Sequence, residues 1–164
     1  MLVVLFFSAS FASFDWIMSL EPDWHSTAFG AVFVASSVLL AFALQLLFSR
    51  SAKLSEQSNS LNNLHLALIG TWSYLVFMEF LTIWSGNLPT ESAWYVHRFQ
   101  GPWWTGVEAV ACLQFIIPLP LLFFRRLKAS LKFTRGLALI SVTCQLFHLY
   151  WMVAPARHAD VFAN

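Results

Sequence analysis

Residues 76–98 read VFMEFLTIWSGNLPTESAWYVHR. An apolar run that carries one carboxylate, Glu79, is followed at once by a segment rich in proline, acidic, basic and aromatic residues. A charged side chain within an apolar helix of membrane length is costly, and such residues usually mark a site or a partner. The function of this chain therefore depends on what surrounds Glu79.

The composition indicates that lipid is the main solvent of the chain. Hydrophobic residues make up 59% of the 164 residues and charged residues 10%, and the mean hydropathy is +0.67. Soluble domains carry about 25% charged residues. A net charge of +1 also argues against a nucleic-acid partner.

The sequence predicts no metal site and no covalently bound cofactor. Cys112 and Cys144 both lie in apolar runs without C-x-x-C spacing or a companion histidine cluster, which is typical of buried small hydrophobic residues. The sequence also has no phosphate-binding glycine loop, no heme-attachment motif and no Ser-His-Asp arrangement.

Five apolar runs are long enough to cross a bilayer core about 30 Å thick. They predict an all-α integral membrane fold, a single bundle of about five transmembrane helices over residues 1–164, with spans at about 1–20, 27–49, 63–85, 104–124 and 136–154. The first run lacks the basic start and the small-residue cleavage site of a signal peptide, so we interpret it as a retained span. Pro118 and Pro120 are expected to interrupt the fourth span.

Basic residues predict the orientation of the bundle. The second and fourth separators hold most of them: Arg50, Lys53, Arg125, Arg126, Lys128, Lys132 and Arg135. By the positive-inside rule these separators are cytoplasmic. The N-terminus of this multi-pass protein then faces the cytoplasm, and the C-terminus faces the outer side of the membrane.

All the tryptophans except Trp72 fall at or near the outer ends of the spans: Trp16, Trp24, Trp84, Trp94, Trp103, Trp104 and Trp151. Indole rings prefer the headgroup level of a bilayer. So uneven a distribution also fits a protein partner seated on the outer face, and the sequence leaves both explanations open.

Four ionisable residues from different spans are expected at one depth. Counted at about 1.5 Å per residue, Asp15, Glu79, Glu108 and His148 lie about 6–10 Å below the outer ends of their spans. Since charges facing lipid are costly, we expect all four to face the bundle interior. Converging carboxyl and imidazole groups exchange protons near neutral pH, so they predict a proton pathway in the outer half of the membrane.

Other polar residues extend this hypothesis or compete with it. The supporting polar residues are Tyr74, Thr82, Gln145 and Tyr150, and Gln145 shares one helix face with His148 and Ser141. In the competing interpretation each acid caps a helix or pairs with Arg98 or Arg157. His65, at the cytoplasmic start of its span, is interpreted as an ordinary interfacial histidine.

Three motifs carry a family resemblance: SFDWIMSLEPDWHSTAFGAVF, IWSGNLPTESAWYVHR and HLYWMVAPA. In this order they resemble ActF, the second NrfD/PsrC-like membrane subunit of bacterial alternative complex III, a quinol:cytochrome c oxidoreductase. The similarity covers nearly the whole chain but only the C-terminal half of the family's full length. The EPDWHS segment departs from the family pattern, so no role is carried over to His25.

The resemblance implies an accessory subunit that binds no heme or metal of its own. Hemes, iron–sulfur clusters and a related NrfD-like subunit are then expected in partner chains, and another chain is expected to supply the N-terminal half. Asp15, Glu79 and His148 lie in or beside the matching motifs. Three functions stay open: a proton pathway coupled to quinol oxidation in a neighbouring subunit, direct binding of quinone by His148 or Glu79 with stacked Trp or Tyr, and a structural anchor for extrinsic subunits.

Overall fold

A computed structural model describes residues 1–21, 24–49, 51–99, 102–121 and 130–158. Its elements are, in chain order, α1 (Leu2–Trp16), the 3₁₀ turn η1 (Met18–Leu20), α2 (Phe29–Phe48), α3 (Ser51–Gly86), α4 (Pro89–Arg98), α5 (Pro102–Ala111), the π turn η2 (Cys112–Ile116), α6 (Pro118–Leu121) and α8 (Leu131–His158). Regular structure in these residues is entirely helical.

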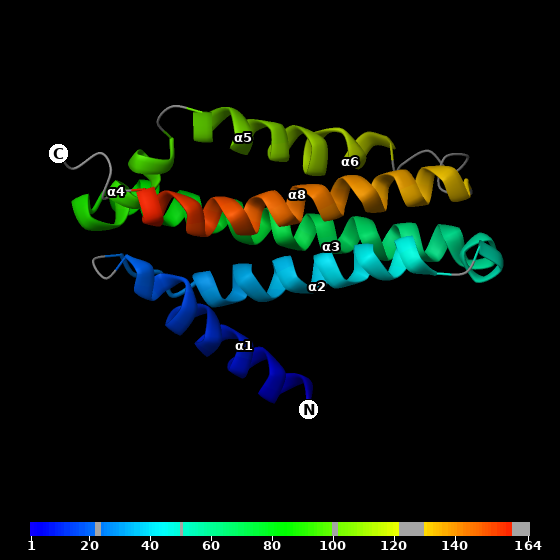
Figure 1. The fold of residues 1–164 in the computed structure, drawn as a ribbon, viewed down its shortest axis with the longest axis horizontal. Coiled ribbons are helices and arrows are strands. Elements are labelled where there is room, and N and C mark those ends of the chain that lie inside the picture. Colours follow the sequence, from blue (N-terminus) through cyan, green and yellow to red (C-terminus); the bar gives the residue numbers. More distant parts are fainter. Residues whose placement is uncertain (22–23, 50, 100–101, 122–129, 159–164) are drawn as a thin grey trace.

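The prediction of an all-α membrane bundle is confirmed. Four helical segments are long and apolar enough to cross a membrane, namely Val3–Leu20, Phe29–Phe48, Gln57–Gly86 and Leu131–Ala154, and Trp104–Ile116 is a shorter apolar helix. Helices α2, α3 and α8 lie side by side, α5 lies beside α8, and α1 runs obliquely away from α2 (Figure 1). Helix α4 covers one end of the bundle, which we call the α4 end.

The chain reverses sharply between α3 and α4. Asn87 adopts a left-handed backbone conformation with φ 46°, which asparagine tolerates better than most residues and which stops a helix. Pro89 then opens α4 at a position where its missing N–H leaves no hydrogen bond unmade. The short connection holds α4 over the end of the bundle.

The predicted interruption of the fourth span takes the form of a π turn. The N–H of Ile117 donates to the carbonyl of Cys112 at 2.9 Å, a bond that spans five residues instead of four. This wider turn directly precedes Pro118, whose ring clashes with a regular α-helical backbone. Gln114, in the middle of the π turn, is fully buried.

Two of the segments between the predicted spans contain helix. Residues 51–62 form the first turns of α3 because the segment contains neither proline nor glycine, and polar side chains are tolerated where a helix extends past the apolar core. The predicted loop at 86–103 contains α4. Helix α8 is longer than the span predicted at 136–154 and begins at Leu131.

Some predictions fall outside the described residues. They concern the basic residues Arg50, Arg125, Arg126 and Lys128, the last three residues of the predicted fourth span, and the C-terminal tail after His158. The side chains of Trp103 and Arg157 are also outside the described part of the chain.

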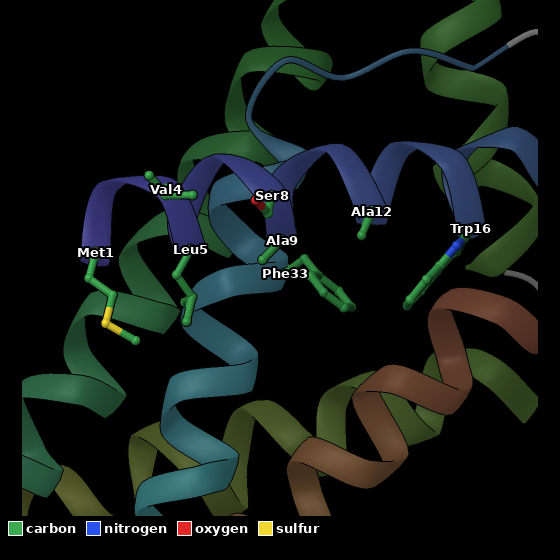
Figure 2. A pocket seen from close by; sticks show the side chains of 8 residues that line it. All are labelled: Met1, Val4, Leu5, Ser8, Ala9, Ala12, Trp16 and Phe33. Atoms are coloured by element: carbon green, nitrogen blue, oxygen red, sulfur yellow. The ribbon is translucent and has the colours of Figure 1, made fainter.

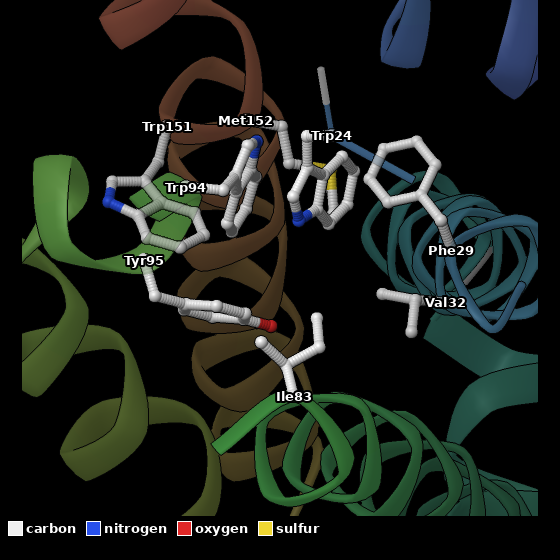
Figure 3. Close-up of a cluster of buried hydrophobic side chains, with 8 residues drawn as sticks. All are labelled: Trp24, Phe29, Val32, Ile83, Trp94, Tyr95, Trp151 and Met152. Carbon is white, nitrogen blue, oxygen red and sulfur yellow. The ribbon is translucent and has the colours of Figure 1, made fainter. Parts of the chain in front are cut away.

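The largest group of buried apolar side chains lies at the α4 end. This aromatic cluster consists of Trp24, Phe29, Val32, Ile83, Trp94, Tyr95, Trp151 and Met152, which come from five parts of the chain (Figure 3). Trp16, Trp84 and Trp104 are exposed instead. Buried aromatic side chains contribute large apolar areas, so the cluster fixes how α2, α3, α4 and α8 meet.

Helix α1 contacts the bundle through one narrow face. A Cβ added at Gly30 would lie 2.8 Å from the Cβ of Ser10, so α1 and α2 approach closely at this glycine. Toward its N-terminus α1 diverges and leaves a hollow of about 740 Å³, lined by Met1, Val4, Leu5, Ser8, Ala9, Ala12, Trp16 and Phe33 (Figure 2). None of these eight lining side chains is an acid or a base.

The close approach predicts the effect of adding one methyl group. Gly30→Ala should push α1 away from α2 and destabilise the protein by about 1–3 kcal/mol, as overpacking does in well-packed cores. Gly136→Ala is the matched control, because a Cβ there meets nothing within 4 Å. Thermal unfolding in detergent measures both variants, and equal midpoints for the two would contradict the close approach.

Candidate functional site

Glu79 lies on the inner face of α3. Its side chain is only 6% exposed, and the hydroxyl of Ser26 donates to its Oε1 at 2.5 Å. Ser26 precedes α2, so the bond joins two segments that are far apart in sequence. The buried carboxyl is thus held by a neutral donor instead of a cation.

His148 reaches the same region from α8 and is 7% exposed. Its ring meets the ring of Trp72 edge to face, with centroids 5.2 Å apart, and stacks loosely on Trp151 at 6.1 Å. Its Nδ1 is buried and has no hydrogen-bond partner among the described residues. The imidazole is therefore positioned by aromatic contacts and keeps free capacity for hydrogen bonding.

Trp72 is itself fixed in place. Its Nε1–H donates to the hydroxyl of the fully buried Ser36 at 2.9 Å, which ties α3 to α2. Trp72 and Glu79 are seven residues apart on α3, so they lie two turns, about 10 Å, apart on one face. His148 therefore contacts a residue of α3 that lies two turns from Glu79.

A cavity of about 700 Å³ connects the two groups. Its walls come from α2, α3, α4, α5, η2 and α8, and they include Glu79, His148, Trp72, Tyr95, Trp94 and Trp151. The exposed lining residues Tyr74 and Phe77 belong to α3, and Trp104 belongs to α5. The cavity therefore opens at the side of the bundle, between α3 and α5.

Tyr95 provides a second polar group near the carboxyl. Burial raises the pKa of Tyr95, the nearby charge of Glu79 raises it further, and Arg98 opposes this shift. The phenol therefore stays protonated at physiological pH and remains a hydrogen-bond donor. In Figure 3 its ring lies below the indoles of Trp94 and Trp151.

Arg98, on α4, is paired with Glu21 and not with Glu79. Its Nη2 donates to the Oε1 of Glu21 at 2.6 Å and forms an ion pair with it. Burial lowers the pKa of Arg98, whereas the hydrogen bond and the charge of Glu21 oppose the shift. The competing interpretation, in which Arg98 neutralises the acid of the third span, is wrong for Glu79.

Buried polar side chains continue from the cavity toward the opposite end of the bundle. On α8 they are His148, Gln145, Ser141 and Thr134, which share one face, and we call them with Asn62 and His65 of α3 the polar column. Asn62 donates to Thr134 at 2.8 Å, and Nε2 of His65 lies 3.0 Å from the hydroxyl of Ser141. Between these bonds and the cavity, the amide of Gln145 is buried without a hydrogen-bond partner in the described residues.

The structure brings together two of the four predicted ionisable residues. Glu79 and His148 line one cavity, whereas Asp15 and Glu108 are exposed. The expectation that all four face the interior is therefore wrong for these two. Helices α1 and α5 are peripheral and contact the bundle through a single face, and Asp15 and Glu108 lie off that face.

The four supporting polar residues also differ in whether they lie at the cavity or in the polar column. Tyr74 lines the opening of the cavity, and Gln145 belongs to the polar column. Thr82 is exposed and donates to the carbonyl of Met78 on its own helix at 2.7 Å. Tyr150 is exposed and is not part of the cavity wall.

Several residues of the site were not found from the sequence. Ser26 lies just before an apolar run and Ser36 lies within it, and hydroxyl residues in such positions usually bond to their own helix. The pair of Glu21 with Arg98 joins residues 77 positions apart. His65 was interpreted as interfacial but is fully buried. A single amide such as Gln114 within an apolar run does not alter the hydrophobic periodicity of the sequence, so its burial could not be predicted.

No group of three or more His, Cys, Asp or Glu that suits a metal ion occurs in the described part of the chain. Comparison with known families finds no family model that matches the chain, and comparison with curated proteins finds no similar sequence. The membrane bundle and the geometry of the cavity are thus the basis for any function assigned to it.

The bond from Trp72 to Ser36 can be tested with a matched pair of neighbouring serines. Ser36→Ala leaves a buried indole N–H without a partner and should destabilise the protein by about 1–3 kcal/mol. Ser37→Ala is the control, since Ser37 is exposed and bonds only to the Phe33 carbonyl of its own helix. Unfolding by denaturant in detergent measures the difference, and equal stabilities would mean that the interhelical bond is not formed.

Proposed function

We propose that this chain is a membrane subunit of a respiratory quinol:electron-acceptor oxidoreductase and that its cavity binds the quinone ring. The observation that carries the proposal is a cavity, open at the side of the bundle, that is lined by a buried carboxyl, an imidazole and several indoles. Its volume of about 700 Å³ suits a small ligand, since such pockets measure about 300–1,000 Å³. Quinones reach their sites from the membrane, which fits a lateral opening.

The two polar groups suit a ring with oxygens on opposite sides. His148 contacts Trp72, whose position on α3 lies two helical turns, about 10 Å, from that of Glu79. A six-membered ring with para oxygens, extended by one hydrogen bond at each end, has a comparable length. The indole faces of the wall offer stacking surfaces between these ends.

The groups also suit the proton chemistry of the reaction. Oxidation of a quinol to a quinone releases two protons and two electrons. Glu79 as a carboxylate and His148 as a neutral imidazole each accept one proton from a hydroxyl. The electrons pass to a heme or iron–sulfur group in a partner subunit, and this chain supplies binding and proton acceptance.

A proton pathway is the second candidate function, and the polar column favours it. The predicted pathway lies in the outer half of the membrane. The polar column would extend it from the cavity toward the opposite end of the bundle. From Thr134 to His148 it extends along 14 residues of α8, about 21 Å at about 1.5 Å per residue. Buried polar groups inside membrane helices commonly mark such relays.

The same proposal includes the orientation and the partners. The α4 end faces the periplasm, and the opposite end, with its basic connections, faces the cytoplasm of a bacterial inner membrane. Helix α1 contacts the bundle through one face only, and Asp15 is exposed near its end. Since a carboxylate facing lipid is costly, we place the chain that supplies the N-terminal half against α1.

Filling the cavity tests quinone binding directly. Gly70→Phe adds a ring at a lining position where a Cβ meets nothing within 4 Å, so it should weaken binding of decylubiquinone at least tenfold. Gly136→Phe adds the same ring outside the cavity as the control. Quenching of tryptophan fluorescence in nanodiscs measures the affinity, and unchanged binding in Gly70→Phe would remove the cavity as the site.

Proton transfer is tested in the assembled complex in vesicles. Glu79→Gln and Gln145→Leu should each reduce quinol-dependent proton movement about tenfold, equivalent to about 1.4 kcal/mol on the barrier. Gln45→Leu, at an exposed position of α2, is the control for loss of an amide. If Gln145→Leu behaves like Gln45→Leu while Glu79→Gln is impaired, protons do not use the polar column.

A further inference from the structure

The short segment before α2 contacts α3 and α4 at three points, and two of these contacts, with Trp94 and Glu79, are with residues that line the cavity. Glu21 forms the ion pair with Arg98, Trp24 stacks on Trp94 with centroids 4.5 Å apart, and Ser26 donates to Glu79. Arg98 and Trp94 belong to α4, and Glu79 belongs to α3. The segment that orients the buried carboxyl is therefore itself attached to α4.

Arg98 is the centre of this attachment. Its side chain is 1% exposed, and its guanidinium lies 3.8 Å from the centroid of the Trp94 ring. It also donates to the carbonyl of Trp94 at 3.3 Å and to the carbonyl of Met152, on α8, at 3.1 Å. One cation thus ties α4, α8 and the segment of Glu21 together.

Ser26 has a defined effect on Glu79. Its bond occupies Oε1, and no second bond to this carboxyl is found among the described residues. A carboxyl held at one oxygen is turned so that the other oxygen stays open to a ligand. The hydroxyl of Ser26 reaches Oε1 only if the segment stays in place.

We propose that the Glu21–Arg98 pair is a positioning device that holds Ser26 against Glu79 and so sets the orientation of the carboxyl in the cavity. Glu21, Arg98 and Ser26 are positioning residues, because they act through Glu79. An effect of this orientation on a bound ligand rests on the proposed quinone function. The coupling from Arg98 to Glu79 is independent of that function.

The infrared carboxyl band of Glu79 measures this coupling in the full chain without quinone. The band is assigned by its disappearance in Glu79→Gln. Ser26→Ala should shift it, and Glu21→Gln, a mild change at a partly exposed residue, should shift it in the same direction. Glu91→Gln, on α4 without an ion pair in the structure, should leave it unchanged.

A double-mutant comparison separates positioning from a direct effect of the charge of Arg98. If Arg98 acts through Ser26, Arg98→Met shifts the band in the native background and adds nothing in the Ser26→Ala background. An equal shift in both backgrounds overturns the proposal, as does an unshifted band in Glu21→Gln. Arg98→Lys keeps the charge but loses the planar contact. The Glu79 band of this variant should therefore lie between its positions in the native chain and in Arg98→Met.

Binding of decylubiquinone then tests the link to the proposed function. Ser26→Ala and Glu21→Gln should each weaken binding about fivefold, the usual value of one misplaced hydrogen bond. Shifted bands with unchanged affinity support the positioning device and contradict the quinone site. Unshifted bands with weakened affinity contradict the positioning device alone.

Discussion

The need to satisfy one buried carboxyl inside an apolar bundle is the constraint on which the rest of this structure depends. Glu79 lies where an unpaired charge is costly, and the nearest cation on α4, Arg98, is bound to Glu21 instead. The carboxyl is satisfied by one hydroxyl from a distant segment. This arrangement stabilises the acid without neutralising it, which leaves it able to exchange a proton.

The aromatic cluster follows from the same constraint. A segment that must bring Ser26 to α3 needs firm attachment at the end of the bundle, and stacked indoles with a buried guanidinium supply it. Aromatic pairs contribute about 0.5–1.5 kcal/mol beyond the area they bury. Trp94, Tyr95 and Trp151 of this cluster also line the cavity, so the packing that holds the acid also shapes the space beside it.

The sequence predicts the fold better than it predicts the site. Apolar runs of membrane length indicate the long helices, because lipid requires every backbone hydrogen bond to be made within a helix. Burial of Glu79 and His148 follows from the cost of exposing them. The outward position of Asp15 and Glu108 depends on which helices are peripheral, and a local sequence pattern does not show this. The bonds of Ser26 and Arg98 join segments far apart in sequence, so they leave no local pattern either.

Photoaffinity labelling tests the central claim most directly, that Glu79 and His148 share one quinone pocket open to lipid. An azido-quinone irradiated with the assembled complex in nanodiscs should label peptides of α3 and α5 that carry Tyr74, Phe77 and Trp104, and excess decylubiquinone should suppress the labelling. Labels confined to the hollow beside α1, or labels that excess decylubiquinone does not suppress, would contradict the account.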